Sequence, residues 1–170
     1  MAVWQYELLL IPRERVIHDF GTLEAHMSAE QWDETDWWSQ HQPPPDFQIR
    51  IAAVVPAYQS WTPAILMWGA EDSDRIHVCL DDAHQRIEEI SIRLDLRRPF
   101  QQFAHAICDL ARYADCVFAS LPHHTFEPSF ERLMSEIAGS ESARFVRAPL
   151  KYLEELARDP NKEAQGWTHD

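Results

Sequence analysis

The amino-acid sequence predicts an α+β domain in which helices pack on one face of a mostly antiparallel sheet. Residues 64–97 contain three apolar runs separated by polar turns, a pattern typical of an antiparallel meander. Residues 100–114 carry the apolar stripe of an amphipathic helix. Apolar residues form 45% of the 170-residue chain, which is ordinary for a globular protein and too high for a disordered one.

The sheet is expected to contain an N-terminal strand, the three-strand meander and one further strand. The first strand spans residues 3–11, and its end is apolar on both faces, which is typical of a central strand. Strict alternation of apolar and polar residues is clearest at 90–96, which we expect to pair with residues 75–80. The other expected strands are 65–68 and 116–121, and the polar turns of the meander are 69–74 and 81–85.

Residues 46–55 fit a helix or a strand. We favour a helix because the apolar residues recur at helical spacing and Pro56 provides a stop, although the Ile and Val content leaves a strand open. A capping box formed by Ser28 and Gln31 predicts a short helix from Ala29. The remaining expected elements are a helix at 130–138 that ends at Gly139, a small edge strand at 143–146 and a helix at 150–157. Residues 1–158 are predicted to form one domain and residues 159–170 a polar tail.

The chain is strongly acidic, with 28 Asp and Glu against 15 Lys and Arg, a net charge of −13. This charge argues against nucleic acid and anionic membranes as partners, because both need clustered basic residues. Residues 19–46 carry seven of the acids, no Lys or Arg, and three Trp. Such a segment could steer a basic protein partner and anchor it through its Trp side chains, or the Trp could simply pack on the sheet. The predicted partner-binding residues are Asp33, Glu34, Asp36, Trp37 and Trp38, with Glu71, Asp72 and Asp74 as a second acidic edge.

An enzyme of small substrates that uses His123, His124 and Glu127 is the main alternative, because these residues follow a predicted strand end. A metal site needs a third ligand at a defined spacing, and none is evident, so we expect neither a metal nor a cofactor. We expect polar turns rather than sites in two other clusters, which are Glu71–Asp74, where a calcium loop would need a Gly, and Asp81, Asp82 and His84. Four Gly in the whole chain leave no phosphate-binding loop.

The cysteines Cys79, Cys108 and Cys116 are odd in number and scattered, which favours free thiols and a reducing compartment. We expect Cys108 and Cys116 to be buried packing residues. The longest apolar run, Leu8–Ile11, is far shorter than the ~20 residues of a membrane span, and no signal-peptide pattern is present. The sequence therefore predicts a cytoplasmic protein.

The sequence contains four short patterns, which are Trp4-x-Tyr6-x-Leu8-Leu9, Asp36-Trp37-Trp38, Ile65-Leu66-Met67-Trp68-Gly69 and Ile90-x-Ile92-Arg93-Leu94-Asp95. Together they resemble small uncharacterised bacterial proteins, some of which accompany secreted toxins and are taken to be their immunity proteins. The similarity covers residues 4–150 and implies an intracellular, non-catalytic protein that neutralises a toxin domain by binding. The leading hypothesis is therefore an immunity-type inhibitor that occludes a basic partner; a structural or regulatory module that forms a homodimer is a further alternative.

Overall fold

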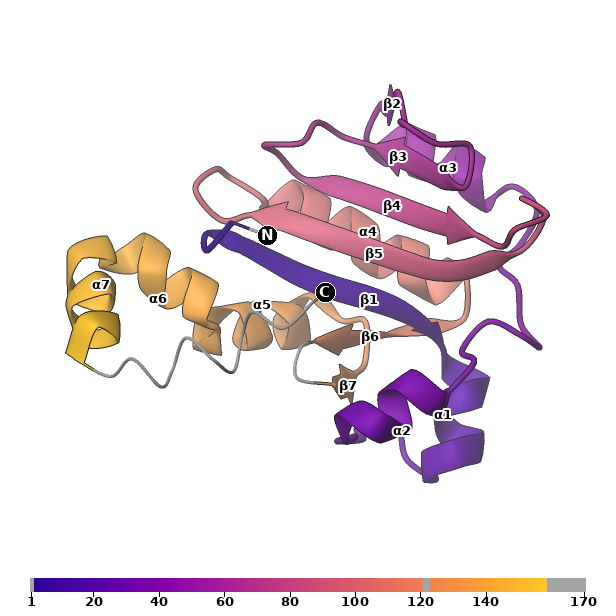
Figure 1. Ribbon diagram of the computed structural model, residues 1–170, viewed down its shortest axis with the longest axis horizontal. Coiled ribbons are helices and arrows are strands. Elements are labelled where there is room, and N and C mark those ends of the chain that lie inside the picture. Colours follow the sequence, from indigo (N-terminus) through magenta and orange to yellow (C-terminus); the bar gives the residue numbers. More distant parts are fainter. Residues whose placement is uncertain (1, 121–122, 159–170) are drawn as a thin grey trace.

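The computed structural model describes residues 2–120 and 123–158, and the expected tail at 159–170 lies outside them. This part of the chain forms an antiparallel sheet of seven strands in the order β2-β3-β4-β5-β1-β6-β7, with seven helices (Figure 1). The α+β fold class is thus confirmed. The strands are β1 (Gln5–Pro12), β2 (Ala57–Tyr58), β3 (Ile65–Trp68), β4 (Arg75–Leu80), β5 (Ile87–Asp95), β6 (Cys116–Ser120) and β7 (His124–Phe126). The helices are α1 (Arg13–Phe20), α2 (Ala29–Glu34), α3 (Phe47–Val54), α4 (Gln101–Tyr113), α5 (Phe130–Gly139), α6 (Glu141–Arg147) and α7 (Pro149–Arg158).

The N-terminal strand β1 lies in the middle of the sheet, between β5 and β6, as its apolar faces predict. Leu8 is the cross-strand partner of Ile92. Ile92 is in turn the partner of Ile76 on β4, so the expected pairing within the meander is confirmed. These three side chains are at most 1% exposed and form a continuous apolar row across three strands.

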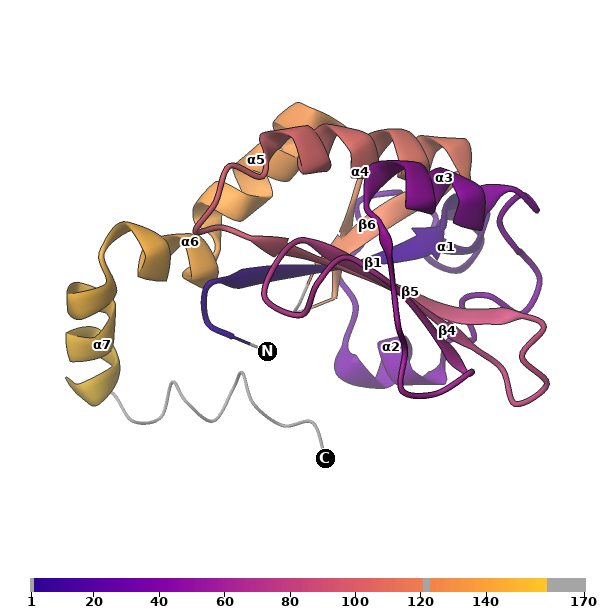
Figure 2. The same cartoon turned by 90° about the horizontal axis from the view of Figure 1, so that it is seen from above.

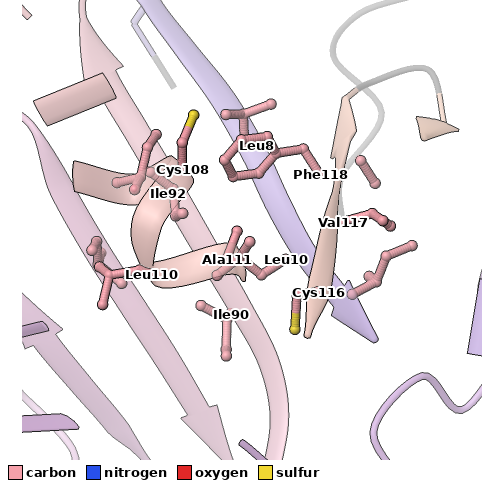
Figure 3. Packing of buried hydrophobic residues seen from close by; sticks show 14 of the residues in the cluster. Leu8, Leu10, Ile90, Ile92, Cys108, Leu110, Ala111, Cys116, Val117 and Phe118 are labelled. Carbon is pink, nitrogen blue, oxygen red and sulfur yellow. The ribbon is translucent and has the colours of Figure 1, made fainter. Parts of the chain in front are cut away.

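One face of the sheet is covered by α3, α4 and α5, whereas α2 lies on the other side (Figure 2). The apolar stripe of α4 packs onto the row just described. Figure 3 shows Cys108 and Ala111 of α4 beside Ile92 and Ile90 of β5. All four side chains are 0–1% exposed, so the core of the protein lies between this helix and the central strands.

The prediction of an edge strand at 143–146 is wrong, because these residues belong to α6. Ser140 caps that helix: its hydroxyl accepts a hydrogen bond from the backbone N–H of Ala143, at 3.2 Å. Val146 is the one β-branched residue of the run, so local preference favours a helix once the cap forms. Residues 46–55 contain α3, so the helical interpretation of that segment is confirmed.

Three short elements were not expected from the sequence. Helix α1 follows β1 directly and buries one residue, Val16, so it has almost no apolar stripe to detect. Its clearest signal is Gly21, which has φ +70° at the C-cap. Strands β2 and β7 contain two and three residues, too few for an alternating pattern.

Candidate functional site

The two tryptophans of the predicted acidic surface are core residues. Trp37 is 8% exposed and Trp38 is 1% exposed. The Trp37 ring lies 4.9 Å from that of Trp32 and 6.2 Å from that of Phe20, measured between centroids. Neither Trp37 nor Trp38 can therefore reach a partner, and the alternative in which the Trp residues pack in the fold is the one that the structure supports.

The acidic residues of that prediction separate into two places. Asp33, Glu34 and Asp36 are exposed in and just after α2, which contacts His123 immediately before β7. Residues 71–74 instead join β3 to β4, which lie toward the opposite edge of the sheet. Four strand spacings of ~4.8 Å separate β4 from β7, so the two acidic groups are not adjacent on the sheet.

The turn at 71–74 has a structural role. The Asp74 carboxylate accepts a hydrogen bond from the backbone N–H of Asp95, at 2.8 Å, and burial raises the pKa of Asp74. Asp72 lies 3.8 Å from the Arg98 guanidinium. The second acidic edge is therefore tied into the end of β5 and is partly neutralised by arginine, which leaves Glu71 as its most available carboxylate.

His123, His124 and Glu127 do not converge on a common site. The Glu127 carboxylate accepts two hydrogen bonds from Arg13, at 2.8 and 2.7 Å, and these lower its pKa. His124 stacks on His26 with the ring centroids 4.3 Å apart, while His123 stacks on Trp32 at 4.9 Å. Among the described residues no group of three His, Cys, Asp or Glu side chains could hold a metal ion.

A groove of about 860 Å³ is present on the face of the sheet that α4 does not cover. Cross-strand pairing assembles its floor: Arg75 lies opposite Arg93, and Met67 lies opposite His77. These residues alternate along their strands with Ile76 and Ile92, which face α4, so their side chains point the other way. We call this hollow the open-face groove; its lining includes Tyr58, Trp61, Met67, Arg75, His77 and Arg93.

Two exposed aromatic residues form the rim of the open-face groove. Trp61 is 74% exposed and Tyr58 is 50% exposed. Ser60, between them, holds a turn: its hydroxyl donates to the carbonyl of Thr62 at 2.8 Å. A second hollow of about 400 Å³ is also lined by Tyr58 and Trp61, so the two rings stand between two concave surfaces.

The floor of the groove contains one arginine whose charge is balanced and one whose charge is not. Arg93 donates through Nε to the Glu7 carboxylate at 3.0 Å. Arg75 is only 8% exposed, and its guanidinium donates a 3.4 Å hydrogen bond to the backbone carbonyl of Glu71. Its Nε has no hydrogen-bond partner among the described residues. His77 Nε2 is likewise buried without a partner there, and burial lowers the pKa of His77, so its imidazole is neutral at pH 7.

The sequence carried a signal for this groove. Arg75 and His77 alternate with the apolar residues of a predicted strand, and Arg93 has the same position in the strand predicted to pair with it. The strand pairing places these three side chains on one face of the sheet, and the register places Arg75 opposite Arg93. Their burial depends in addition on the segment at 58–61, which lines the same groove.

Comparisons with protein-family models, with curated proteins and with solved structures find nothing that matches this chain. No helix in the described part of the chain has the length and apolar character needed to cross a membrane.

Proposed function

We propose that the protein is a non-catalytic binding protein and that another protein binds in its open-face groove. The observation that carries the proposal is Trp61, a large aromatic side chain that is 74% exposed at the rim of a hollow of about 860 Å³. Exposed Trp and Tyr beside a concave surface are typical of the residues that dominate binding energy in protein interfaces. The floor adds Arg75 and Arg93, and arginine is enriched in protein interfaces together with Trp and Tyr.

An immunity-type inhibitor that occludes a basic toxin domain is the second candidate. It is supported by Asp33, Glu34 and Asp36, which are exposed carboxylates in a segment without Lys or Arg. With Trp37 and Trp38 in the core, this surface would act through charge rather than through aromatic anchors. Binding there would therefore weaken strongly as salt increases.

Affinity purification of the tagged protein from cells that produce it distinguishes the two surfaces. We expect Trp61→Ala to lose the co-purifying partner, whereas Ile49→Ala retains it. Ile49 is a matched control because it is 72% exposed but lies on α3, which covers the other face of the sheet. Each variant is first checked for an unchanged thermal melt, which its exposure predicts.

The same purification with the double variant Asp33→Asn, Glu34→Gln tests the second candidate. Loss of the partner with this variant, together with its retention by Trp61→Ala, would replace the groove by the acidic surface of α2. Retention by both variants would contradict both candidates.

We also propose a reducing compartment, the cytoplasm, as the location. The described cysteines Cys79, Cys108 and Cys116 are all free thiols. Burial raises the pKa of Cys108 to about 12 and also raises that of Cys79, so these thiols are protonated and slow to oxidise. Labelling of free thiols in freshly lysed cells checks this, because a disulfide-bonded fraction would contradict it.

A further inference from the structure

We propose that the floor of the open-face groove recognises a carboxylate of the bound protein, next to an apolar or aromatic side chain that packs on Trp61 and Tyr58. This inference rests on the proposed function and specifies the chemistry of the partner. The carboxylate would lie between Arg75 and Arg93, within reach of His77.

The unbalanced charge of Arg75 is the first argument. A guanidinium cannot lose its proton in a protein, so a buried one needs an anion or a full set of acceptors. Arg75 is 8% exposed, with Nε unpartnered among the described residues, and Arg93 lies directly opposite on β5. Like charges in direct cross-strand positions repel each other, and Glu7 balances one of the two. An anion bridging both guanidinium groups would remove this repulsion and supply the missing acceptor.

The charges around the floor favour a carboxylate over a phosphate. Glu7 is engaged with Arg93, and Glu71 also lines the groove. The neutral imidazole of His77 adds a hydrogen-bonding group without adding a positive charge to those of Arg75 and Arg93. The site therefore has room for a single negative charge, whereas a phosphate, with about −1.5 to −2 at pH 7, would be repelled by both glutamates.

The apolar residues beside the floor determine what accompanies the carboxylate. Met67 is the cross-strand neighbour of both His77 and Tyr58, so an apolar strip runs from the floor to the rim. Trp61 provides an exposed ring above it. A peptide with an aromatic residue next to a carboxylate matches this order of apolar and charged groups.

Nuclear magnetic resonance titration of the ¹⁵N-labelled protein with small peptides tests this inference. The probes are acetyl-phenylalanine with a free carboxylate, acetyl-Phe-Glu-amide, the neutral acetyl-phenylalanine amide, and inorganic phosphate. We expect at least one carboxylate peptide to shift the backbone amides of Trp61, Arg75 and Arg93, and to bind about tenfold or more tightly than the neutral amide. The tighter of the two carboxylate peptides shows whether a chain terminus or an acidic side chain is preferred. Equal binding of the neutral amide, tighter binding of phosphate, or no shift with either carboxylate peptide would overturn the proposal.

Arg75→Met is the decisive variant, and Arg50→Met is its control, because Arg50 is exposed and lies on α3. We expect Arg75→Met to bind the carboxylate peptides about tenfold or more weakly than the wild type and to melt at the same or a higher temperature, since it removes an unpaired buried charge. Unchanged affinity overturns the proposal, as does a markedly lower melting temperature, which would make Arg75 a structural residue.

Arg75→Lys keeps the charge without the planar guanidinium group and should bind the carboxylate peptides with intermediate affinity. If partner capture requires Trp61 while the carboxylate peptides fail, the groove remains the binding surface and the carboxylate is wrong.

Discussion

Arg75 on β4 and Arg93 on β5 are direct cross-strand partners, and Ile76 and Ile92 are the pair beside them on the opposite face. The isoleucines are at most 1% exposed beneath α4, where they belong to the core. The same two strands therefore stabilise the fold through one face and present charge through the other. Arg75→Met should change binding with little cost in stability, and a substitution on the isoleucine face should do the reverse.

Ile107→Ala should lower the free energy of unfolding by roughly 2–5 kcal/mol, because truncation of a core side chain leaves a cavity. Ile107 is 0% exposed in the middle of α4. Denaturant unfolding followed by circular dichroism measures the change. Gln102→Ala, at an exposed position of the same helix, should alter stability by less than about 0.5 kcal/mol. A loss below about 1 kcal/mol for Ile107→Ala would show that this stripe is not part of the core.

Gly69→Ala should destabilise the protein by at least about 2 kcal/mol. Gly69 directly follows β3 and has φ +83°, and an added Cβ would lie 2.1 Å from the backbone carbonyl oxygen of Asp74. Gly139→Ala is the matched control, since nothing lies within 4 Å of the added Cβ in the last turn of α5. We expect the control to be neutral or to stabilise by up to about 1 kcal/mol in the same unfolding experiment. Equal stability of the two variants would contradict the turn geometry at 69–74.

Local periodicity was enough to predict most of the fold. The alternation in β4 and β5 and the stripe of α4 are properties of a few consecutive residues, so they can be read without knowledge of the rest of the chain. Helix α1 and strand β7 depend instead on contacts with distant segments. For β7, the backbone N–H of Thr125 donates to the carbonyl of Ala25 at 2.9 Å. The two residues are 100 positions apart in the sequence, so no local pattern predicts this contact.

The candidate site was harder to predict because it depends on which side chains the fold covers. Trp37 and Trp38 are adjacent in sequence and lie beside exposed acids, yet both are buried. Burial of the large apolar surface of a Trp side chain stabilises the fold, whatever residues precede or follow it in the sequence. Trp61 lies between Ser60 and Thr62, in a segment without acidic residues or an apolar period, and is 74% exposed. Composition located a group of acidic residues, of which Asp33, Glu34 and Asp36 are exposed, but it could not show which Trp would face solvent.

Asp95→Asn should lower stability at pH 7 by about 1–3 kcal/mol, and the difference from the wild type should vanish in acid. The Asp95 side chain is 1% exposed and accepts hydrogen bonds from Arg97, at 2.9 and 2.7 Å, which lower its pKa. Because the pKa is lower in the folded state, the stabilisation is present above the unfolded value of about 3.9 and is lost as the pH falls through the folded value. Urea melts at pH 7 and in acid measure the effect, with Asp74→Asn as the control.

Asp74→Asn keeps the oxygen that accepts from the Asp95 backbone N–H. Burial raises the pKa of Asp74, so its charge is unfavourable in the folded state at pH 7, and its removal should leave stability unchanged or higher. A loss as large as that of Asp95→Asn would contradict this assignment of the two carboxylates.

The double variant Asp33→Asn, Glu34→Gln should leave the thermal melt unchanged, because both side chains are exposed at the end of α2. Its effect on association with the captured partner depends on the binding surface. If the partner binds in the open-face groove, the association rate at 0.1 M salt should match that of the wild type. The acids of α2 lie beside β7, four strand spacings of ~4.8 Å from β4, and this separation exceeds the Debye length of ~10 Å. If the acidic surface of α2 binds a basic partner, the variant should associate more slowly and with a weaker dependence on salt, because screening acts over a Debye length that falls from ~10 Å at 0.1 M to ~3 Å at 1 M. Stopped-flow association at two salt concentrations therefore separates the surfaces: a slower, salt-insensitive variant would reject the groove, and an unchanged rate would leave these acids as a solvated face.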